Sequence, residues 1–365
     1  MEKSLLTTGK NQNNVLELCK NSSENIVLMP AGQQSIHFAK YLKKHSINIE
    51  FFVDNNPQKH GIFINDIPVI SFDEYKKVNN KKFLIISTNK YIEQEIINQL
   101  KKNEIKNYEC SIADYICYTS NEIDNARELM EKNWESYSKL YNMLEDNISK
   151  KTLINRLNYL ISYNKDFLKE IMQLPEKQYF EPEIYKITSN DYFVDCGAFD
   201  GDTLNNLMNN VNFEIAGYYG FEPDNVNYEQ LCKKAKQYKN TSIINKGIYK
   251  EDTTLKFNST NNSSAQLNEN GNIEIKVTSL DNFFKDKKVS FIKMDIEGGE
   301  KDAILGAKDL IKEQKPVLAI SVYHKFKDIY ELPFLIHSFN VKYRYYLRHY
   351  TSCSSETIFY AVPEE

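Results

Sequence analysis

The segment that most constrains the fold is residues 192–203, which read YFVDCGAFDGDT. An apolar run typical of a buried strand ends at Asp195, glycines follow at 197 and 201, and a helical pattern begins near Thr203. A strand, a glycine turn and a helix in this order form the first unit of a parallel α/β sheet, in which the turn lets a ligand approach the backbone closely. The segment therefore predicts a nucleoside-like ligand at the carboxyl edge of such a sheet.

The rest of the C-terminal half continues this alternation. Four further strands are expected, in GYYGFEP, TSIINKG, VSFIKMD and PVLAISVYH, and most are followed by helical patterns. Residues 251–278 instead predict a hairpin, formed by TTLKFN and NIEIKV around NENGN. The tail adds two strands, VKYRYYLRHY and ETIFYAV, with no full helix between them. Parallel strands finished by an antiparallel hairpin are typical of the class I methyltransferase sheet, a Rossmann-like α/β fold.

A chain of 365 residues is long for one compact domain. Strand and helix patterns alternate between residues 25 and 118, which predicts a smaller Rossmann-like domain over residues 1–119. The pattern is then helical as far as Leu174, and we expect a helical connector over residues 120–185. The methyltransferase-like domain is expected over residues 186–365.

Charge and hydropathy narrow the possible functions. The net charge of −4, from 46 basic and 50 acidic residues, lacks the basic excess of a nucleic-acid-binding protein. No apolar run approaches the roughly 20 residues that span a bilayer, and the N-terminus has no secretory h-region. The six cysteines form no CxxC pair. We expect a cytoplasmic, bacterial protein with reduced thiols and no nucleic-acid partner.

The glycine turn is unusually acidic for a phosphate-binding loop. Asp195, Asp200 and Asp202 flank its glycines, and carboxylates beside a pyrophosphate would repel it in a partly dry site. S-adenosylmethionine carries no phosphate but has a sulfonium cation, an ammonium group and a ribose diol, all of which suit carboxylates. The turn therefore predicts a cationic nucleoside as cofactor.

Two more segments support this prediction. Glu222 ends the next strand, 27 residues after Asp195, where an acid can accept hydrogen bonds from both ribose hydroxyls. Capping of the helix that begins near Asp224 is the alternative role. In FIKMDIEGGE, Asp295 ends a strand at the ligand-binding edge, and Glu297 and Glu300 begin a helix, where the helix dipole favours acids.

Together, DCGAFDGDT, FEP and IKMDIEGGE resemble the motifs of the FkbM family of S-adenosylmethionine-dependent methyltransferases, over roughly residues 192–362. The resemblance implies methylation, mostly of hydroxyl groups on sugars and secondary metabolites. It also implies cofactor-binding roles for eight residues: Asp195, Gly197, Ala198, Gly201, Thr203, Glu222 on the ribose, and Asn245 and Gly247 near the adenine. One departure is that Phe199 stands where the family has Asn, and Asp200 replaces an apolar residue.

The acceptor site is expected at the same sheet edge. His324, which ends the fifth strand, is a candidate general base because its ordinary pKa of about 6.5 suits neutral pH; a loop hydrogen bond is the alternative. Asp295 and Glu297 are candidates to orient the acceptor, and without a clear third ligand we predict no metal. Arg348 is a candidate to bind an anionic group of the acceptor, or else stacks on tyrosines.

The front domain has a degraded dinucleotide motif, PAGQQS, with only Gly32 in place and Asp54 as a candidate ribose ligand 22 residues later. Substrate docking or formation of a homo-oligomer is favoured over nucleotide binding, and Asp54 would then only start a turn. The leading function is methyl transfer to a hydroxyl or amine of a small-molecule or glycan-linked sugar or similar polar acceptor. The alternatives are an NAD-dependent oxidoreductase of sugar metabolism and a catalytically inactive cofactor-binding scaffold.

Overall fold

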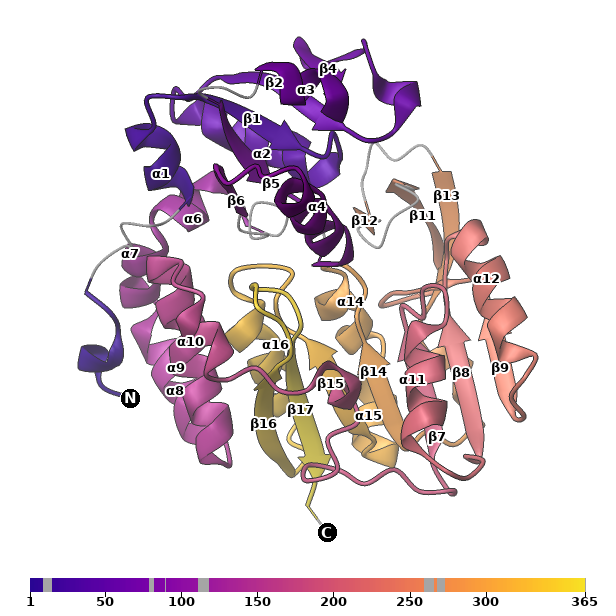
Figure 1. Cartoon of the computed structure of the whole chain (residues 1–365). Helices are drawn as coiled ribbons and strands as arrows, with labels where there is room; N and C mark the ends of the chain where they lie inside the picture. The colour runs from indigo at the N-terminus through magenta and orange to yellow at the C-terminus, as the bar shows by residue number, and fades with distance from the viewer. Residues whose placement is uncertain are drawn as a thin grey trace.

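The computed structural model describes residues 1–8, 15–78, 82–88, 90–110, 118–258, 266–267 and 273–364. It contains two α/β parts, each a sheet with its helices, joined by a helical segment (Figure 1). We call them the N-terminal layer and the larger C-terminal layer. Both layers are built on mainly parallel sheets, as the alternation of strands and helices predicts.

The N-terminal sheet has six strands in the order β3-β4-β2-β1-β5-β6. All neighbours pair in parallel except β3 and β4, which form an antiparallel edge. Its strands are β1 (Asn25–Met29), β2 (Ile49–Asp54), β3 (Phe63–Ile64), β4 (Ile67–Ser71), β5 (Lys82–Ile86) and β6 (Tyr108–Cys110). The helices of this part are α1 (Val15–Asn21), α2 (Gln33–Lys44), α3 (Phe72–Val78) and α4 (Lys90–Lys102), with short 3-10 turns η1 (Lys3–Leu5) and η2 (Pro57–Lys59).

The middle segment is helical, as predicted. It contains α6 (Ser120–Asp124), α7 (Ala126–Lys132), α8 (Trp134–Met143), α9 (Asn147–Ser162), α10 (Asp166–Lys169) and the 3-10 turn η3 (Pro175–Lys177). The longest helix, α9, begins where the Asp146 carboxylate accepts the Ser149 backbone N–H at 2.7 Å, and it ends at Tyr163 in the left-handed conformation. It packs against the edge of the C-terminal sheet.

The C-terminal sheet has seven strands in the order β16-β17-β15-β14-β7-β8-β9. These are β7 (Tyr192–Cys196), β8 (Gly217–Phe221), β9 (Thr241–Ile244), β14 (Phe291–Met294), β15 (Val317–Ser321), β16 (Tyr343–His349) and β17 (Thr357–Pro363). The helices are α11 (Asp202–Asn210), α12 (Asn225–Ala235), α13 (Leu280–Phe283), α14 (Glu300–Leu305), α15 (Lys308–Gln314) and α16 (Asp328–His337). Only β17 runs antiparallel, paired with β15 and β16, which confirms the predicted C-terminal hairpin.

A small separate sheet has the order β10-β13-β11-β12. Its strands are β10 (Gly247–Ile248), β11 (Thr253–Asn258), β12 (Gln266–Leu267) and β13 (Ile273–Thr278). The antiparallel pairing of β11 with β13 confirms the predicted hairpin, while its expected NENGN turn lies outside the described residues.

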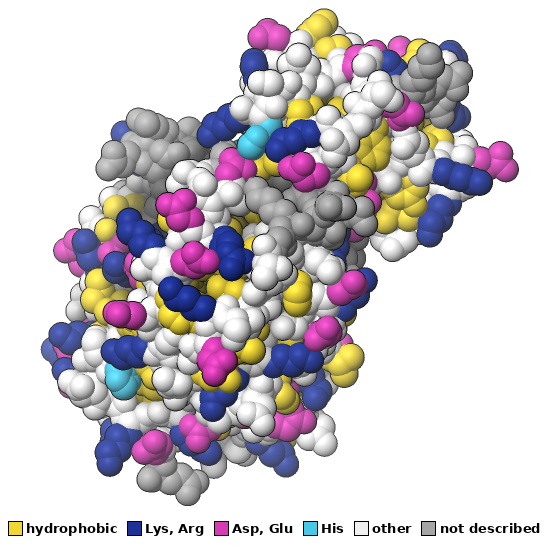
Figure 2. All heavy atoms as spheres, turned by 90° about the vertical axis from the view of Figure 1, so that its left-hand side faces the viewer, with side chains coloured by type: hydrophobic (Ala, Val, Ile, Leu, Met, Phe, Trp, Pro, Cys, Tyr) yellow, Lys and Arg dark blue, Asp and Glu magenta, His cyan; other side chains and the backbone are white. Residues whose placement is uncertain are grey.

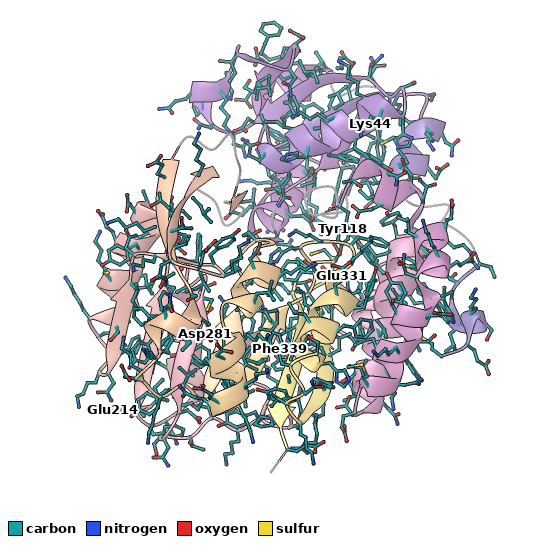
Figure 3. The ribbon with its side chains drawn as sticks, turned by 180° about the vertical axis from the view of Figure 1, so that it is seen from behind. Lys44, Tyr118, Glu214, Asp281, Glu331 and Phe339 are labelled. Atoms are coloured by element: carbon teal, nitrogen blue, oxygen red, sulfur yellow. The ribbon has the colours of Figure 1, made fainter. Side chains whose placement is uncertain are left out.

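The two α/β layers share one hydrophobic core. A single cluster of buried side chains runs from the N-terminal sheet, for example Leu28, through Leu153 of α9 to Leu318 of β15. The carboxyl ends of the parallel C-terminal strands point towards the N-terminal layer (Figure 1). Tyr118 lies between the two layers (Figure 3), where its ring packs edge-on against Phe326, with the ring centroids 5.6 Å apart.

The surface carries mixed charge on the face seen in Figure 2, where basic and acidic side chains are interspersed. Among the described residues, no helix is both long and apolar enough to cross a membrane. The five described cysteines carry free thiols, and Cys19 and Cys196 are buried; Cys117 lies outside the described residues.

Candidate active site

The glycine turn joins β7 to α11. Gly197 has φ +80°, and a Cβ atom there would lie 1.9 Å from the backbone oxygen of Asp295 on the neighbouring strand. The backbone N–H groups of Gly197 and Ala198 both donate to Phe221 O, at 3.1 and 3.0 Å. Gly201, with φ +90°, precedes the first turn of α11. The turn is therefore fixed against two neighbouring strands, and only glycine fits at residue 197.

Asp195 lies beneath this turn and is fully buried. Its carboxylate is 2.9 Å from Lys293 Nζ and accepts a hydrogen bond of 2.6 Å from the Tyr218 hydroxyl. Lys293 also donates to Gly197 O at 2.7 Å. Burial lowers the pKa of Lys293, but Asp195 and other nearby carboxylates hold it above its ordinary value. Asp195 thus stabilises the turn indirectly, through a buried ion pair with the lysine that binds Gly197 O.

The other two acids of the turn, Asp200 and Asp202, differ in whether a basic side chain pairs with them. Asp200 points to α12, where it forms a 2.9 Å ion pair with Lys234. Asp202 stands at the first position of α11, and burial raises its pKa. Thr203 is buried beside it. Of the three acids, only Asp202 remains without a basic partner within ion-pair distance among the described residues.

Phe199, at the position where the family has Asn, adopts φ +45°. This left-handed conformation is unfavourable for most residues but is tolerated by Asn. The contribution of Phe199 to the site is its backbone N–H, which donates to Glu222 Oε2 at 3.0 Å.

Because any residue except proline supplies that N–H, we expect Phe199→Asn to bind S-adenosylhomocysteine within about threefold of the wild-type affinity. Calorimetric titration of both proteins measures this. A large gain in affinity would instead identify the turn as a degraded version of the family's loop.

Glu222 follows directly after β8, beside the turn. Its two carboxylate oxygens accept backbone N–H groups from Phe199 at 3.0 Å and from Asp224 at 2.9 Å. Burial raises its pKa to about 7. The helix α12 is capped by Asp224 itself, whose carboxylate accepts Val226 N–H and Asn227 N–H. Glu222 therefore joins two loops and is not the helix cap.

Asn245 and Gly247 lie beyond the end of β9. The Asn245 side chain donates to Glu222 O at 3.1 Å, so it links the ends of β8 and β9. Gly247 is buried in β10, where a Cβ atom would approach a side-chain methyl of Val277 to 3.1 Å. Asn245 thus adjoins the Glu222 loop, whereas Gly247 packs into the small sheet.

Asp295 follows β14 and is surrounded by proton donors. The Tyr179 hydroxyl donates to its Oδ2 at 2.9 Å, and the Tyr323 hydroxyl lies 3.3 Å from both carboxylate oxygens. His324 Nε2 lies 3.3 Å from Asp295 Oδ1. Two segments distant in sequence, around Tyr179 and around Tyr323 and His324, therefore converge on this one carboxylate.

His324 lies where the sequence predicts, but in a more acidic environment. Its Nδ1 is 2.9 Å from Glu300 Oε1, and its Nε2 is 3.6 Å from Glu297 Oε2. Burial lowers the pKa of His324, yet Glu300, Asp295 and Glu297 raise it to about 10. The expectation of an ordinary pKa near 6.5 is therefore wrong, because carboxylates that only the fold brings together raise it.

The carboxylates around His324 are also perturbed. Burial raises the pKa of Glu297 to about 8 and that of Glu356, which lies near Asp295, to about 7. Asp295, Glu300 and His324 each offer a metal-ligand atom within 4.8 Å of one another. The sequence analysis considered only Asp295 and Glu297 as candidate ligands, so it did not predict this grouping. We call Asp295, Glu297, Glu300, Glu356 and His324 the acidic edge.

Arg348 does not reach this edge. Its guanidinium binds the Asp146 carboxylate through both terminal nitrogens, at 3.2 and 2.7 Å, and donates to Ser149 Oγ at 2.8 Å. These contacts tie β16 to the start of α9. The geometry gives no support to the predicted role in acceptor binding. The guanidinium also lies over the Tyr346 ring, 6.0 Å from its centroid, which agrees with the alternative of stacking on a tyrosine, although the side chain is buried.

In the front domain, the residue that was a candidate to bind a ribose also has partners within the protein. Asp54 accepts the backbone N–H groups of Ala31 at 2.9 Å and Asn56 at 2.8 Å, and forms a 3.0 Å ion pair with Lys59. These contacts match the role of starting a turn. They give no support to NAD binding at this position.

Sequence reasoning missed four residues of the site. Lys293 stands in the third motif, and its position opposite Asp195 on the neighbouring strand was the available signal. Tyr323 directly precedes His324. Tyr179 and Glu356 come from segments outside the motifs, and only the fold brings them to Asp295.

The sheet order, the single antiparallel strand and the glycine turn define a class I methyltransferase fold. Residues 195–350 match the model of the methyltransferase FkbM domain. This is the family whose motifs the sequence resembles, and the match confirms that resemblance over this part of the chain. No curated protein matches the sequence.

One solved structure shares this fold over almost the whole chain, and two others are similar over about half of it. The crystal structure of methyltransferase FkbM from Methylobacillus flagellatus KT is similar over 97% of this chain and 94% of its own, with a TM-score of 0.70 and 21% identity. Fibrillarin from Aeropyrum pernix, with natively bound S-adenosyl-L-methionine, covers 55% of this chain and 74% of its own, at a TM-score of 0.33 and 12% identity. Precorrin-6y C5,15-methyltransferase from Geobacter metallireducens GS-15 is similar over 54% of this chain and 92% of its own, with a TM-score of 0.35 and 8% identity.

Proposed function

We propose that the protein transfers the methyl group of S-adenosylmethionine to a hydroxyl or amine of a sugar, a glycan-linked sugar or a similar small polar acceptor. The observation that carries the proposal is the convergence of the glycine turn, Glu222 and the acidic edge at one end of a class I sheet. Ligands of open α/β sheets bind at this end.

The electrostatics favour this cofactor over a dinucleotide. Asp202, Glu222 and the four carboxylates of the acidic edge gather here, and the cationic partners buried among them are Lys293 and His324. A cofactor with a sulfonium and an ammonium group balances such an excess of carboxylates, whereas a pyrophosphate adds to it. Gly197, Ala198, Gly201 and Thr203 are proposed to line the cofactor, with Asp195 supporting the turn from below. Glu222 is proposed to hold the ribose, with Asn245 and Gly247 on the adenine side.

Cofactor affinity is expected to depend on pH through Glu222. The carboxylate accepts ribose hydroxyl hydrogen bonds best when ionised, and burial raises its pKa to about 7. Affinity for S-adenosylhomocysteine should therefore rise as pH increases through 7 and fall below it. Calorimetric titrations between pH 6 and about 8.5 test this.

Glu222→Gln is the control, because it keeps the shape but cannot ionise. It should bind more weakly and lose the pH dependence near 7. An unchanged pH profile in this variant would assign the titration to another group.

Acceptor chemistry is assigned to Asp295, Glu297 and His324. Methyl transfer is an in-line displacement at the sulfonium methyl, so holding the acceptor oxygen or nitrogen in line supplies much of the rate enhancement. The carboxylate of Asp295 can accept a hydrogen bond from a sugar hydroxyl and take up the proton that a hydroxyl acceptor loses, and Glu297 can hydrogen-bond a second hydroxyl. His324 Nε2 faces both side chains, 3.3 Å from Asp295 Oδ1 and 3.6 Å from Glu297 Oε2. This polar, acidic lining suits a hydroxyl-rich or amine-bearing acceptor.

Turnover tests the proposal. The protein is incubated with S-adenosylmethionine and panels of sugars, amino sugars and nucleotide sugars, and release of S-adenosylhomocysteine is measured. Acceptor-dependent release that falls at least about a hundredfold in Asp295→Asn supports the proposal. Release that does not depend on any acceptor of these classes, with the cofactor bound, would contradict the proposed acceptor.

A further inference from the structure

His324 has an unusual environment for a buried histidine. Its side chain is 2% exposed, and among the described residues neither ring nitrogen has a hydrogen-bond partner of good geometry. Yet Nε2 faces two carboxylate oxygens, Asp295 Oδ1 at 3.3 Å and Glu297 Oε2 at 3.6 Å. These groups are close but poorly aligned for hydrogen bonds.

The separations resemble those between neighbouring ligands of one cation. With metal–nitrogen and metal–oxygen bonds of about 2.0–2.2 Å, adjacent ligand atoms lie about 3.0–3.5 Å apart. The measured 3.3 and 3.6 Å are close to this range. A cation bound to Nε2 and to these carboxylate oxygens would replace two misaligned contacts with direct bonds.

Glu300 supplies the group that metal-binding histidines usually have on their other nitrogen. Its Oε1 lies 2.9 Å from His324 Nδ1 and also accepts the Ile296 backbone N–H at 2.9 Å. Glu300 is the first residue of α14, and its side chain is only 1% exposed. Glu300 therefore lies against Nδ1, while Nε2 faces Asp295 and Glu297.

We propose that His324 Nε2 and the carboxylates of Asp295 and Glu297 bind one divalent cation, with Glu300 as the positioning residue. Two carboxylates and one imidazole suit Mn²⁺, with water completing the shell. Binding of the ion does not depend on the proposed function. A catalytic role for the ion does rest on the proposed methyl transfer, in which the cation would orient an acceptor hydroxyl and favour its ionised form.

The test is a titration of the full chain, stripped with a chelator, with Mn²⁺, followed by electron paramagnetic resonance of the free ion. Wild type should bind one Mn²⁺ per chain. His324→Gln and Glu297→Gln should each weaken binding by at least about tenfold, and Glu300→Gln by about 10–100-fold. Glu297 lies on a half-buried loop, so its variant remains informative if the buried substitutions impair folding.

The matched control is His45→Gln. His45 also faces a carboxylate, with its Nε2 3.2 Å from Asp124 Oδ2, but lies outside the acidic edge. This variant should bind Mn²⁺ as wild type does. Failure of wild type to bind Mn²⁺ saturably, or equal binding by all variants, overturns the proposal. S-adenosylhomocysteine binding, measured in parallel without metal, separates that failure from failure of the cofactor assignment.

Discussion

Gly197→Ala is expected to destabilise the protein by about 2–5 kcal/mol and to abolish cofactor binding. The new Cβ atom would lie 1.9 Å from Asp295 O, and the residue would also keep an unfavourable φ of +80°. Either the turn or β14 must move, and both carry proposed site residues. Denaturant unfolding and calorimetric titration with S-adenosylhomocysteine measure the two effects.

Gly61→Ala separates the clash from the backbone strain. Gly61 has a similar φ of +78°, but a Cβ atom there meets nothing within 4 Å. Its substitution should cost only about 1–2 kcal/mol and leave cofactor binding intact. Equal losses in the two variants would show that close packing of the turn on β14 is not what requires glycine at residue 197.

Lys293→Met is expected to cost about 3–5 kcal/mol, because it leaves the Asp195 carboxylate buried without its cation. The side chains of Lys293 and Asp195 are 3% and 0% exposed and 2.9 Å apart. The loss should be smaller in the double variant Lys293→Met with Asp195→Leu, which removes both charges. Denaturant unfolding of the single and double variants gives these free energies.

Lys239→Met is the matched control for this ion pair. Lys239 pairs with Glu214 at 2.8 Å, but these side chains are 77% and 60% exposed. Its substitution should leave the free energy of unfolding nearly unchanged, because water already solvates both charges. A loss this small in Lys293→Met would contradict the structural role assigned to the buried pair.

The architecture could be predicted because local patterns determine it. Apolar strands that end in glycine turns and alternate with helices specify a parallel sheet, and the absence of a helix between the last two strands specifies the final hairpin. Both predictions agree with the sheet order.

The site was less predictable because side-chain direction depends on long-range packing. The acidic turn predicted three similar carboxylates, but Asp195 and Asp200 each have a lysine partner, brought close by β14 and α12. Arg348 was expected to face the acceptor, yet α9 packs over it and provides Asp146. His324 was placed correctly, whereas its pKa depends on carboxylates that only the folded chain gathers around it.

Calorimetric titration with S-adenosylhomocysteine, with NADH in parallel, on wild type and Glu222→Ala tests both the cofactor and its site. Wild type should bind S-adenosylhomocysteine but not NADH. The Glu222 variant should bind S-adenosylhomocysteine at least about tenfold more weakly, since ribose hydrogen bonds to the carboxylate are lost. Binding of NADH in place of S-adenosylhomocysteine would contradict the assignment of the cofactor, and equal affinity in the two proteins would contradict the role of Glu222.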